Sequence, residues 1–206
     1  MSQTRILIAD DHKIVRIGLK AVLGYERDFA VVGEAMDGAQ AVVEAAKLQP
    51  DVVIMDLVMP KKDGVEATRE ICERVPGAKV LLLTTFGTSD GIAHALEAGA
   101  KGAMMKTADD TKIVAAIRTI ARGERYISPD VQRQLRESPP IPQLSQRQAE
   151  VLHAIGRGKT NKQISSQLGI RLDSVEAIAK TLYAKLGASN RAEAVAIAHR
   201  RHLLKT

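Results

Sequence analysis

The sequence predicts a two-part protein: a doubly wound α/β domain with a five-stranded parallel sheet, then an all-α domain of four helices. Three observations support this. Over residues 5–122, short apolar runs alternate with amphipathic stretches of helical length, as expected for strands buried on both faces. The segment Ser138-Pro139-Pro140-Ile141-Pro142 suits neither a helix nor a central strand. Beyond it, only helical periodicity remains.

The first domain is expected at residues 1–123. Its strands are predicted at 5–10, 29–35, 51–56, 79–84 and 102–106, and its helices at 13–25, 38–48, 64–75, 89–98 and 109–122. Asp37 and Asp63 are placed to cap helix starts, and Gly99 to end a helix. Strict alternation of strand and helix favours right-handed crossovers.

A linker is predicted at 124–143 and the second domain at 144–206. Its helices are expected at 145–157, 160–168, 171–186 and 190–202. Ser145 with Gln148 matches a capping box, and Thr160 is placed to begin the second helix. Gly169 and Gly187 are placed to end the second and third helices.

The charge is distributed unequally between the two parts. The chain carries a formal charge of +6. Residues 1–128 hold 17 Lys and Arg against 18 Asp and Glu, whereas residues 129–206 hold 13 against 6. A basic excess confined to the helical part favours a polyanionic partner, although charge alone also fits a solvated basic surface.

The remaining composition favours the cytoplasm. Cys72 is the one cysteine, so neither an internal disulfide nor a CxxC metal site is available, which suits a reducing compartment. The N-terminus does not resemble a signal peptide, and no stretch is apolar enough to span a bilayer. We therefore expect a cytoplasmic protein without a membrane partner.

Polar residues follow four of the predicted strands. Asp10 and Asp11 follow the first, Asp56 follows the third, Thr84 ends the fourth and Lys106 follows the fifth. Carboxyl ends of parallel strands share one edge of a sheet, so these side chains are expected to converge. Clustered carboxylates suit Mg²⁺, and Asp56 can act as a nucleophile toward a phosphoryl group. Lys106 and the Thr84 hydroxyl can contact phosphoryl oxygens.

The motif formed by Asp10-Asp11, Asp56-x-x-Met59-Pro60-x-x-Asp63-Gly64, Thr84 and Lys106 resembles the receiver domain of two-component response regulators. The resemblance covers residues 5–122. It implies a flavodoxin-like sheet, and phosphoryl transfer from a partner histidine kinase to Asp56.

The same resemblance implies the roles of individual residues. Mg²⁺ is expected on Asp10, Asp11, Asp56 and the backbone carbonyl of Val58. Thr84 and Lys106 are expected to act as the switch that senses the phosphoryl group. The chain is then no enzyme beyond accepting and hydrolysing its own phosphoryl group.

Several positions near this motif depart from the pattern or bear on its chemistry. Receivers often carry an aromatic residue where this chain has Ala103, and often a proline where it has Thr107. The positions two residues after Asp56 and Thr84 are Val58 and Phe86, which cannot orient an attacking water. We therefore expect a long-lived phosphoryl group; the alternative is that both residues only pack under neighbouring loops.

In the basic part, the second and third helices fit a helix-turn-helix. The exposed face of the third helix includes Glu176, Ala177 and Lys180, and Lys180 is the best candidate for a contact to a base edge. Candidates for phosphate contacts are Lys162, Arg171, Lys185 and Arg191.

Residues 144–198 resemble the LuxR-type helix-turn-helix of the NarL/FixJ subfamily, through matches that include Glu150, Gly158, Asn161 and the Lys185-Leu186-Gly187 run. The resemblance implies a homodimer when phosphorylated, with the last helix offering Ala194, Ile197 and Ala198 as a contact face. Glu176 and Ile178 stand where the subfamily usually has lysine and histidine, although glutamate can accept from cytosine N4.

Together these features predict a DNA-binding transcriptional response regulator switched at Asp56. Two alternatives stay open: a metal-dependent phosphohydrolase, and a regulator that acts through protein contacts with a degenerate helix-turn-helix. His199 and His202 lie one helical turn apart and could form half of a metal site, but exposed terminal histidines are the simpler interpretation.

Overall fold

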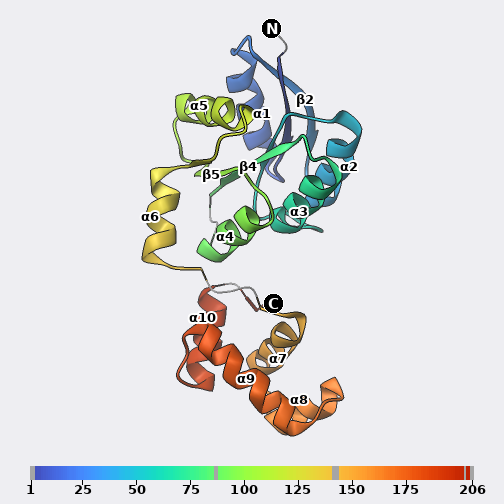
Figure 1. Cartoon of the computed structure of the whole chain (residues 1–206), viewed down its shortest axis with the longest axis vertical. Helices are drawn as coiled ribbons and strands as arrows, with labels where there is room; N and C mark the ends of the chain where they lie inside the picture. The colour runs from blue at the N-terminus through green and yellow to red at the C-terminus, as the bar shows by residue number, and fades with distance from the viewer. Residues whose placement is uncertain (1–2, 86–87, 141–143, 202, 205–206) are drawn as a thin grey trace. The chain divides into compact units, whose positions relative to one another are not determined.

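The computed structural model describes residues 3–85, 88–140, 144–201 and 203–204. These residues divide into two compact units, Met1–Pro140 and Ile141–Thr206, and each is described by itself (Figure 1).

The first unit is built on a parallel sheet with the strand order β2-β1-β3-β4-β5-β6. The strands are β1 (Thr4–Ala9), β2 (Phe29–Ala35), β3 (Val52–Met55), β4 (Lys79–Thr84), β5 (Gly102–Met105) and β6 (Tyr126–Ile127). Every residue of β3 is buried, which explains why its sequence is a continuous apolar run. The five predicted strands are thus confirmed, and the sheet has one more.

Helices cover both faces of this sheet. They are α1 (Lys13–Gly24), α2 (Gly38–Leu48), α3 (Gly64–Arg74), α4 (Ser89–Glu97), α5 (Asp110–Ala121) and α6 (Pro129–Glu137). Buried residues of α2, α3, α4 and α6 form one core cluster, and those of α1 and α5 form another on the opposite face. Alternate residues of β1 enter the two clusters, as the pleat of a strand requires.

The predicted helix boundaries follow from local chemistry. The carboxylates of Asp37 and Asp63 accept from the amides of Gln40 and Glu66, and so cap α2 and α3. Gly99 follows the end of α4 with a φ of +116°, a conformation that favours glycine.

The predicted linker at 124–143 is wrong over most of its length. Residues 126–127 form β6, and 129–137 form α6, whose Val131 is fully buried in the first unit. Ser128 caps this helix and Pro129 occupies its first turn. A strand of two residues is too short to show a hydrophobic period, which explains why the sequence analysis does not predict β6. The first unit therefore extends to Pro140 rather than to residue 123.

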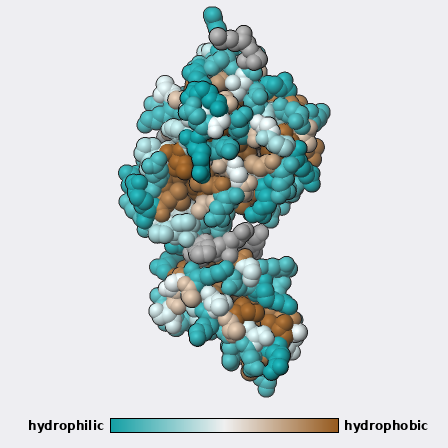
Figure 2. All heavy atoms as spheres, viewed as in Figure 1, coloured by the Kyte–Doolittle hydropathy of each residue, from teal (hydrophilic) through white to brown (hydrophobic). Residues whose placement is uncertain are grey.

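The second unit holds the four predicted helices. They are α7 (Gln146–Gly156), α8 (Asn161–Leu168), α9 (Leu172–Leu186) and α10 (Arg191–Arg200). Ser145 and Gln148 form the predicted capping box, and Thr160 forms a second one with Gln163. All four helices contribute to one apolar core. In Figure 2, hydrophilic residues cover most of the visible surface, with hydrophobic residues in smaller patches among them.

Candidate functional site

The carboxyl edge of the sheet brings together the residues predicted to converge there. Asp10 follows β1, Asp56 follows β3, Thr84 ends β4 and Lys106 follows β5. Asp10, Asp56 and Thr84 are all buried. Two buried carboxylates at one edge need a positive partner, because each raises the energy of the other's charged form.

Lys106 supplies that positive charge. Its Nζ lies 2.6 Å from Oδ2 of Asp10 and 2.7 Å from Oδ2 of Asp56. Burial raises the pKa of Asp56 above its usual value, although the lysine opposes this shift. Burial lowers the pKa of Lys106, but the bonds to the two carboxylates outweigh it and the net shift is upward. The lysine is thus held in its charged form between the two acids.

The backbone around Asp56 is equally constrained. The amide of Leu57 donates to Oδ1 of Asp56 at 2.8 Å, so both carboxylate oxygens have partners. Gly64 packs against the Asp56 carbonyl so closely that an added Cβ would lie 2.1 Å from that oxygen. The sequence marks Gly64 only as part of a motif; the structure shows that no side chain fits there.

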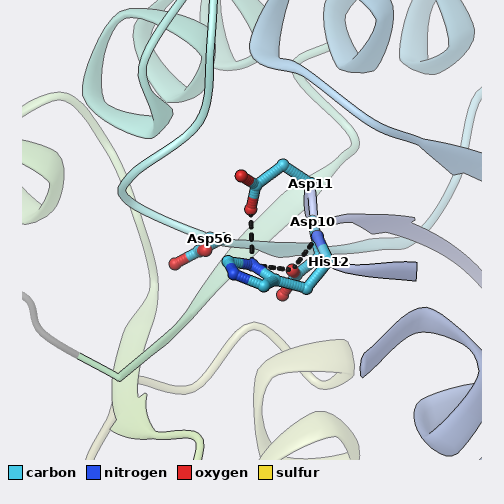
Figure 3. A group of neighbouring side chains, drawn as sticks. All are labelled: Asp10, Asp11, His12 and Asp56. Atoms are coloured by element: carbon cyan, nitrogen blue, oxygen red, sulfur yellow. Dashed lines mark hydrogen bonds and ion pairs between the residues drawn. The ribbon is translucent and has the colours of Figure 1, made fainter. Parts of the chain in front are cut away.

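His12 joins the acidic residues, as Figure 3 shows. Its Nδ1 lies 2.7 Å from Oδ1 of Asp11 and 3.4 Å from Oδ1 of Asp10. Asp10, Asp11, His12 and Asp56 can each offer one ligand atom within 4.8 Å of the others. Three carboxylates at this spacing fit a hard divalent cation. The sequence analysis missed His12, whose signal is its position directly after the two aspartates.

The Thr84 hydroxyl has no hydrogen-bond partner among the described residues, although the residue is only 1 % exposed. A buried hydroxyl without a partner costs about 1–3 kcal/mol. The hydroxyl is therefore available to a ligand that reaches this edge of the sheet. Of the two apolar residues predicted to flank the pocket, Phe86 lies outside the described residues. Val58 is 65 % exposed, so Val58 does not pack under a loop.

In the second unit, α8 and α9 form the predicted helix pair, and Ile164, Val175 and Leu182 are fully buried in its core. Ile178 is partly buried against this core, so it supports packing. The opposite face of α9 exposes Glu176, Ala177 and Lys180, together with further polar residues. The helix therefore presents its predicted contact residues to solvent.

The predicted phosphate contacts divide into two groups. Lys162 and Arg171 are exposed, and Arg171 lies 3.2 Å from Asp173. Lys185 and Arg191 instead bind within the unit: Lys185 donates to Gln148 at 2.9 Å, and the Arg191 guanidinium donates to the carbonyls of Ile155 and Lys159.

The arginine thereby ties α10 to the end of α7, because a guanidinium can satisfy two carbonyls at once. Nη2 of Arg191 thus serves the fold, and its phosphate contact stays a prediction.

The predicted dimer face on α10 is also wrong in part. Ala194 and Ala198 are fully buried in the core of their own unit, and Ile197 is packed against it. Small residues repeating at i and i+4 let a helix approach its neighbours closely, and here the neighbours are α7 and α9. His199 is exposed, whereas His202 lies outside the described residues.

Comparison with known proteins covers both units. Residues 6–118 match the family "Response regulator receiver domain", and residues 142–198 match "Bacterial regulatory proteins, luxR family". No helix in the described part of the chain has the length and apolar character to cross a bilayer.

Similar proteins match along almost the whole chain. The transcriptional regulatory protein LiaR of Bacillus subtilis (strain 168) is 39 % identical, covering 97 % of this chain and 99 % of LiaR. The oxygen regulatory protein NreC of Staphylococcus aureus (strain bovine RF122 / ET3-1) is 36 % identical, covering 98 % and 99 %.

Solved structures agree with these matches. The response regulator ChrA of a heme-sensing two-component system is 34 % identical, with a TM-score of 0.59 over 99 % of this chain and 100 % of ChrA. The response regulator RcsB in complex with DNA is 25 % identical, with a TM-score of 0.68 over 96 % of this chain and 98 % of RcsB. The chain therefore belongs to the two-component response regulators of the NarL/FixJ subfamily, with a receiver domain followed by a LuxR-type DNA-binding domain.

Proposed function

We propose that this protein is a cytoplasmic transcription regulator that a histidine kinase switches by phosphorylating Asp56. The observation that carries the proposal is the pocket of Asp10, Asp56 and Lys106, with the buried hydroxyl of Thr84, which has no partner in the described part of the chain, at the same edge of the sheet. A nucleophilic carboxylate, a cation and a spare hydroxyl are the groups that phosphoryl transfer needs.

In the transfer, a carboxylate oxygen of Asp56 attacks the phosphorus of a phosphohistidine. The new P–O bond forms as the P–N bond breaks, and the histidine nitrogen leaves with the electron pair. Lys106 then has a phosphoryl oxygen as a partner in place of the Asp56 oxygen that it now binds at 2.7 Å. The Thr84 hydroxyl can donate to another phosphoryl oxygen and so gain its missing partner.

The acidic cluster fits Mg²⁺ as the resident cation. Asp10, Asp11 and Asp56 would hold it, with the Val58 carbonyl as a further ligand. When bound, the cation neutralises charge on the transferring group. The protein's residues otherwise only orient and accept the group, so we propose no turnover of a separate substrate.

The output is DNA binding by α8 and α9, in which α9 enters the major groove. The exposed Lys180 contacts a base edge, while Lys162 and Arg171 contact phosphates. We propose that phosphorylation favours a homodimer on two half-sites. The solved structure of two RcsB dimers bound to two parallel DNAs, 25 % identical to this chain, supports that arrangement.

Phosphorylation and DNA binding are tested separately. The full chain is treated with acetyl phosphate and Mg²⁺, and the mass of one added phosphoryl group is followed by intact-mass spectrometry. The parent and a control, Asp110→Asn on an exposed residue of α5, should gain one group, and Asp56→Asn should gain none. Undiminished labelling of Asp56→Asn would refute the assigned acceptor.

DNA binding is measured by electrophoretic shift with a duplex that the parent selects from a randomised pool. Acetyl phosphate should strengthen binding of the parent and leave Asp56→Asn unchanged. Equal strengthening of both proteins would show that the switch lies elsewhere.

A further inference from the structure

Helix α6 lies over the strand from which the pocket lysine emerges. Ile127 of β6 is in register with Ala103 of β5, and the amide of Ser128 donates to the Ala103 carbonyl at 3.0 Å. Val131 of α6 is fully buried in the same core cluster as Ala103. The helix is therefore part of the receiver fold, and Figure 1 shows it beside α4 and the end of β5.

A second contact joins α6 to α4. Ser89, the first residue of α4 and itself buried, donates its hydroxyl to the Gln134 carbonyl of α6 at 3.3 Å. Leu135 of α6 packs against the same core cluster that contains α4 residues. Since α4 begins shortly after Thr84 in the chain, any displacement of α4 on phosphorylation meets α6 directly.

The end of β5 provides a parallel route. Met105 directly precedes Lys106, and it lines a hollow of about 250 Å³ together with Gln134, Glu137 and other residues of α6 and its end. The N-terminal end of α6 is fixed by its cap and by β6, and residues along the helix from Asp130 to Glu137 border this hollow.

The small side chain of Ala103 bears on how a signal could leave the pocket. A methyl group stands where many receivers hold an aromatic side chain, and Ala103 is fully buried. Ala103 pairs with Ile127 of β6 and shares a core cluster with Val131 of α6. A mobile ring at this position is therefore absent as a signal carrier, and α6 occupies the adjacent layer.

We propose that α6 is the output element of this receiver: a phosphoryl group on Asp56 repositions α6 through α4 and the end of β5, and α6 passes the change to the DNA-binding unit. The proposal rests on the proposed phosphorylation of Asp56 and names its regulation. The groups whose partners change are Thr84 and Lys106, and the two elements adjoining them in sequence both contact α6. A packed helix with two discrete positions suits such a switch.

The test uses the full chain with beryllofluoride and Mg²⁺, which mimic the phosphoryl group. Ser89→Ala removes the donor to Gln134, while Thr88 still caps α4. Arg136→Ala, an exposed residue of α6, is the matched control. The readout is the ratio of Kd values for the selected duplex without and with beryllofluoride, which spans about 5- to 150-fold for ordinary allosteric coupling.

We expect this ratio to fall about fivefold in Ser89→Ala, the equivalent of one net hydrogen bond, and to stay unchanged in Arg136→Ala. Hydrogen exchange of the α6 amides in the parent should change when beryllofluoride is added. Unchanged exchange together with a parental ratio in Ser89→Ala would overturn the role of α6. If beryllofluoride fails to strengthen DNA binding by the parent, the proposed function itself fails, and that outcome is distinct.

Discussion

Replacing Lys106 with methionine tests the electrostatics of the phosphorylation pocket. Methionine keeps the length of the side chain but removes the charge that lies between Asp10 and Asp56 at 2.6 and 2.7 Å. The lysine side chain is only 9 % exposed, and those of the two acids are 3 % and 6 % exposed, so solvent screens this cluster little.

Removing one partner of a buried ion pair costs about 3–5 kcal/mol. The cost here falls at the lower end, about 3 kcal/mol, because Asp56 has a raised pKa and can take up a proton. In a chain of this size, 1 kcal/mol corresponds to about 2–4 °C in Tm. We therefore expect the first unit of Lys106→Met to unfold about 6–12 °C lower than that of the parent, in EDTA at neutral pH.

The assay is thermal unfolding followed by circular dichroism, with Lys101→Met, an exposed lysine at the other end of β5, as control. Added Mg²⁺ should restore much of the loss, because a bound cation replaces the missing charge and stabilises the folded state. Acid should also reduce the loss of stability in Lys106→Met. The pKa of Asp56 is raised in the folded protein, and such a group contributes stability at low pH that is lost as pH rises through that pKa. An unchanged Tm in EDTA would refute the reasoning.

Four further predictions follow from individual residues. Asp37, whose pKa is lowered first by the bond from Lys61 at 2.7 Å and then by its capping bonds, stabilises the fold above about pH 4 and loses this effect as pH falls through its lowered pKa. Asp37→Ala should lower the free energy of unfolding by about 1 kcal/mol in urea at pH 7. An equal loss at acid pH would show that the ion pair with Lys61 does not contribute to it. Val58→Asn places an amide that can orient water beside Asp56, so the phosphoryl half-life should shorten about tenfold or more in a decay assay by mass spectrometry; an equal half-life would show that Val58 does not limit hydrolysis. Lys180→Ala should remove the preference for one base pair in selected duplexes at a cost of about 1–3 kcal/mol, whereas a uniform loss with a smaller salt slope would reassign it to phosphate. Glu176→Gln should strengthen binding to random duplex DNA in a titration, because it removes a negative charge from the DNA-facing side; weaker binding would indicate that the carboxylate accepts from a base.

Most of the first unit could be predicted because its signals are local. The buried strand β3 reads as a continuous apolar run, and Asp37 and Asp63 mark helix starts at the residues where they occur. The sequence predicts a linker where β6 and α6 lie, because β6 has two residues and α6 is next to a proline-rich stretch typical of a linker. Its place in the fold depends on the burial of Val131 against distant residues, which no local pattern shows.

The sequence predicts which residues share the site but not which ion pairs they form with one another. Strand ends determine that Asp10, Asp56 and Lys106 share an edge, whereas the bridging of both acids by one ammonium group is a three-dimensional result. In the second unit, both Lys180 and Arg191 are basic, so charge alone does not distinguish their environments. Lys180 is exposed, whereas Arg191 donates to backbone carbonyls of its own unit. The same holds for Ala194, which is suited to a dimer face and to a core alike.

The amino-acid sequence by itself determined the order of elements within residues 5–122 and 145–202, the residues at the strand ends and the family, because period, caps and spacing are properties of neighbouring residues. Only the tertiary structure decided that α6 belongs to the first unit, that the buried Thr84 hydroxyl has no partner among the described residues and that Ala194 faces inward. Those outcomes depend on which surfaces meet when distant segments pack, and burial is created only at that step.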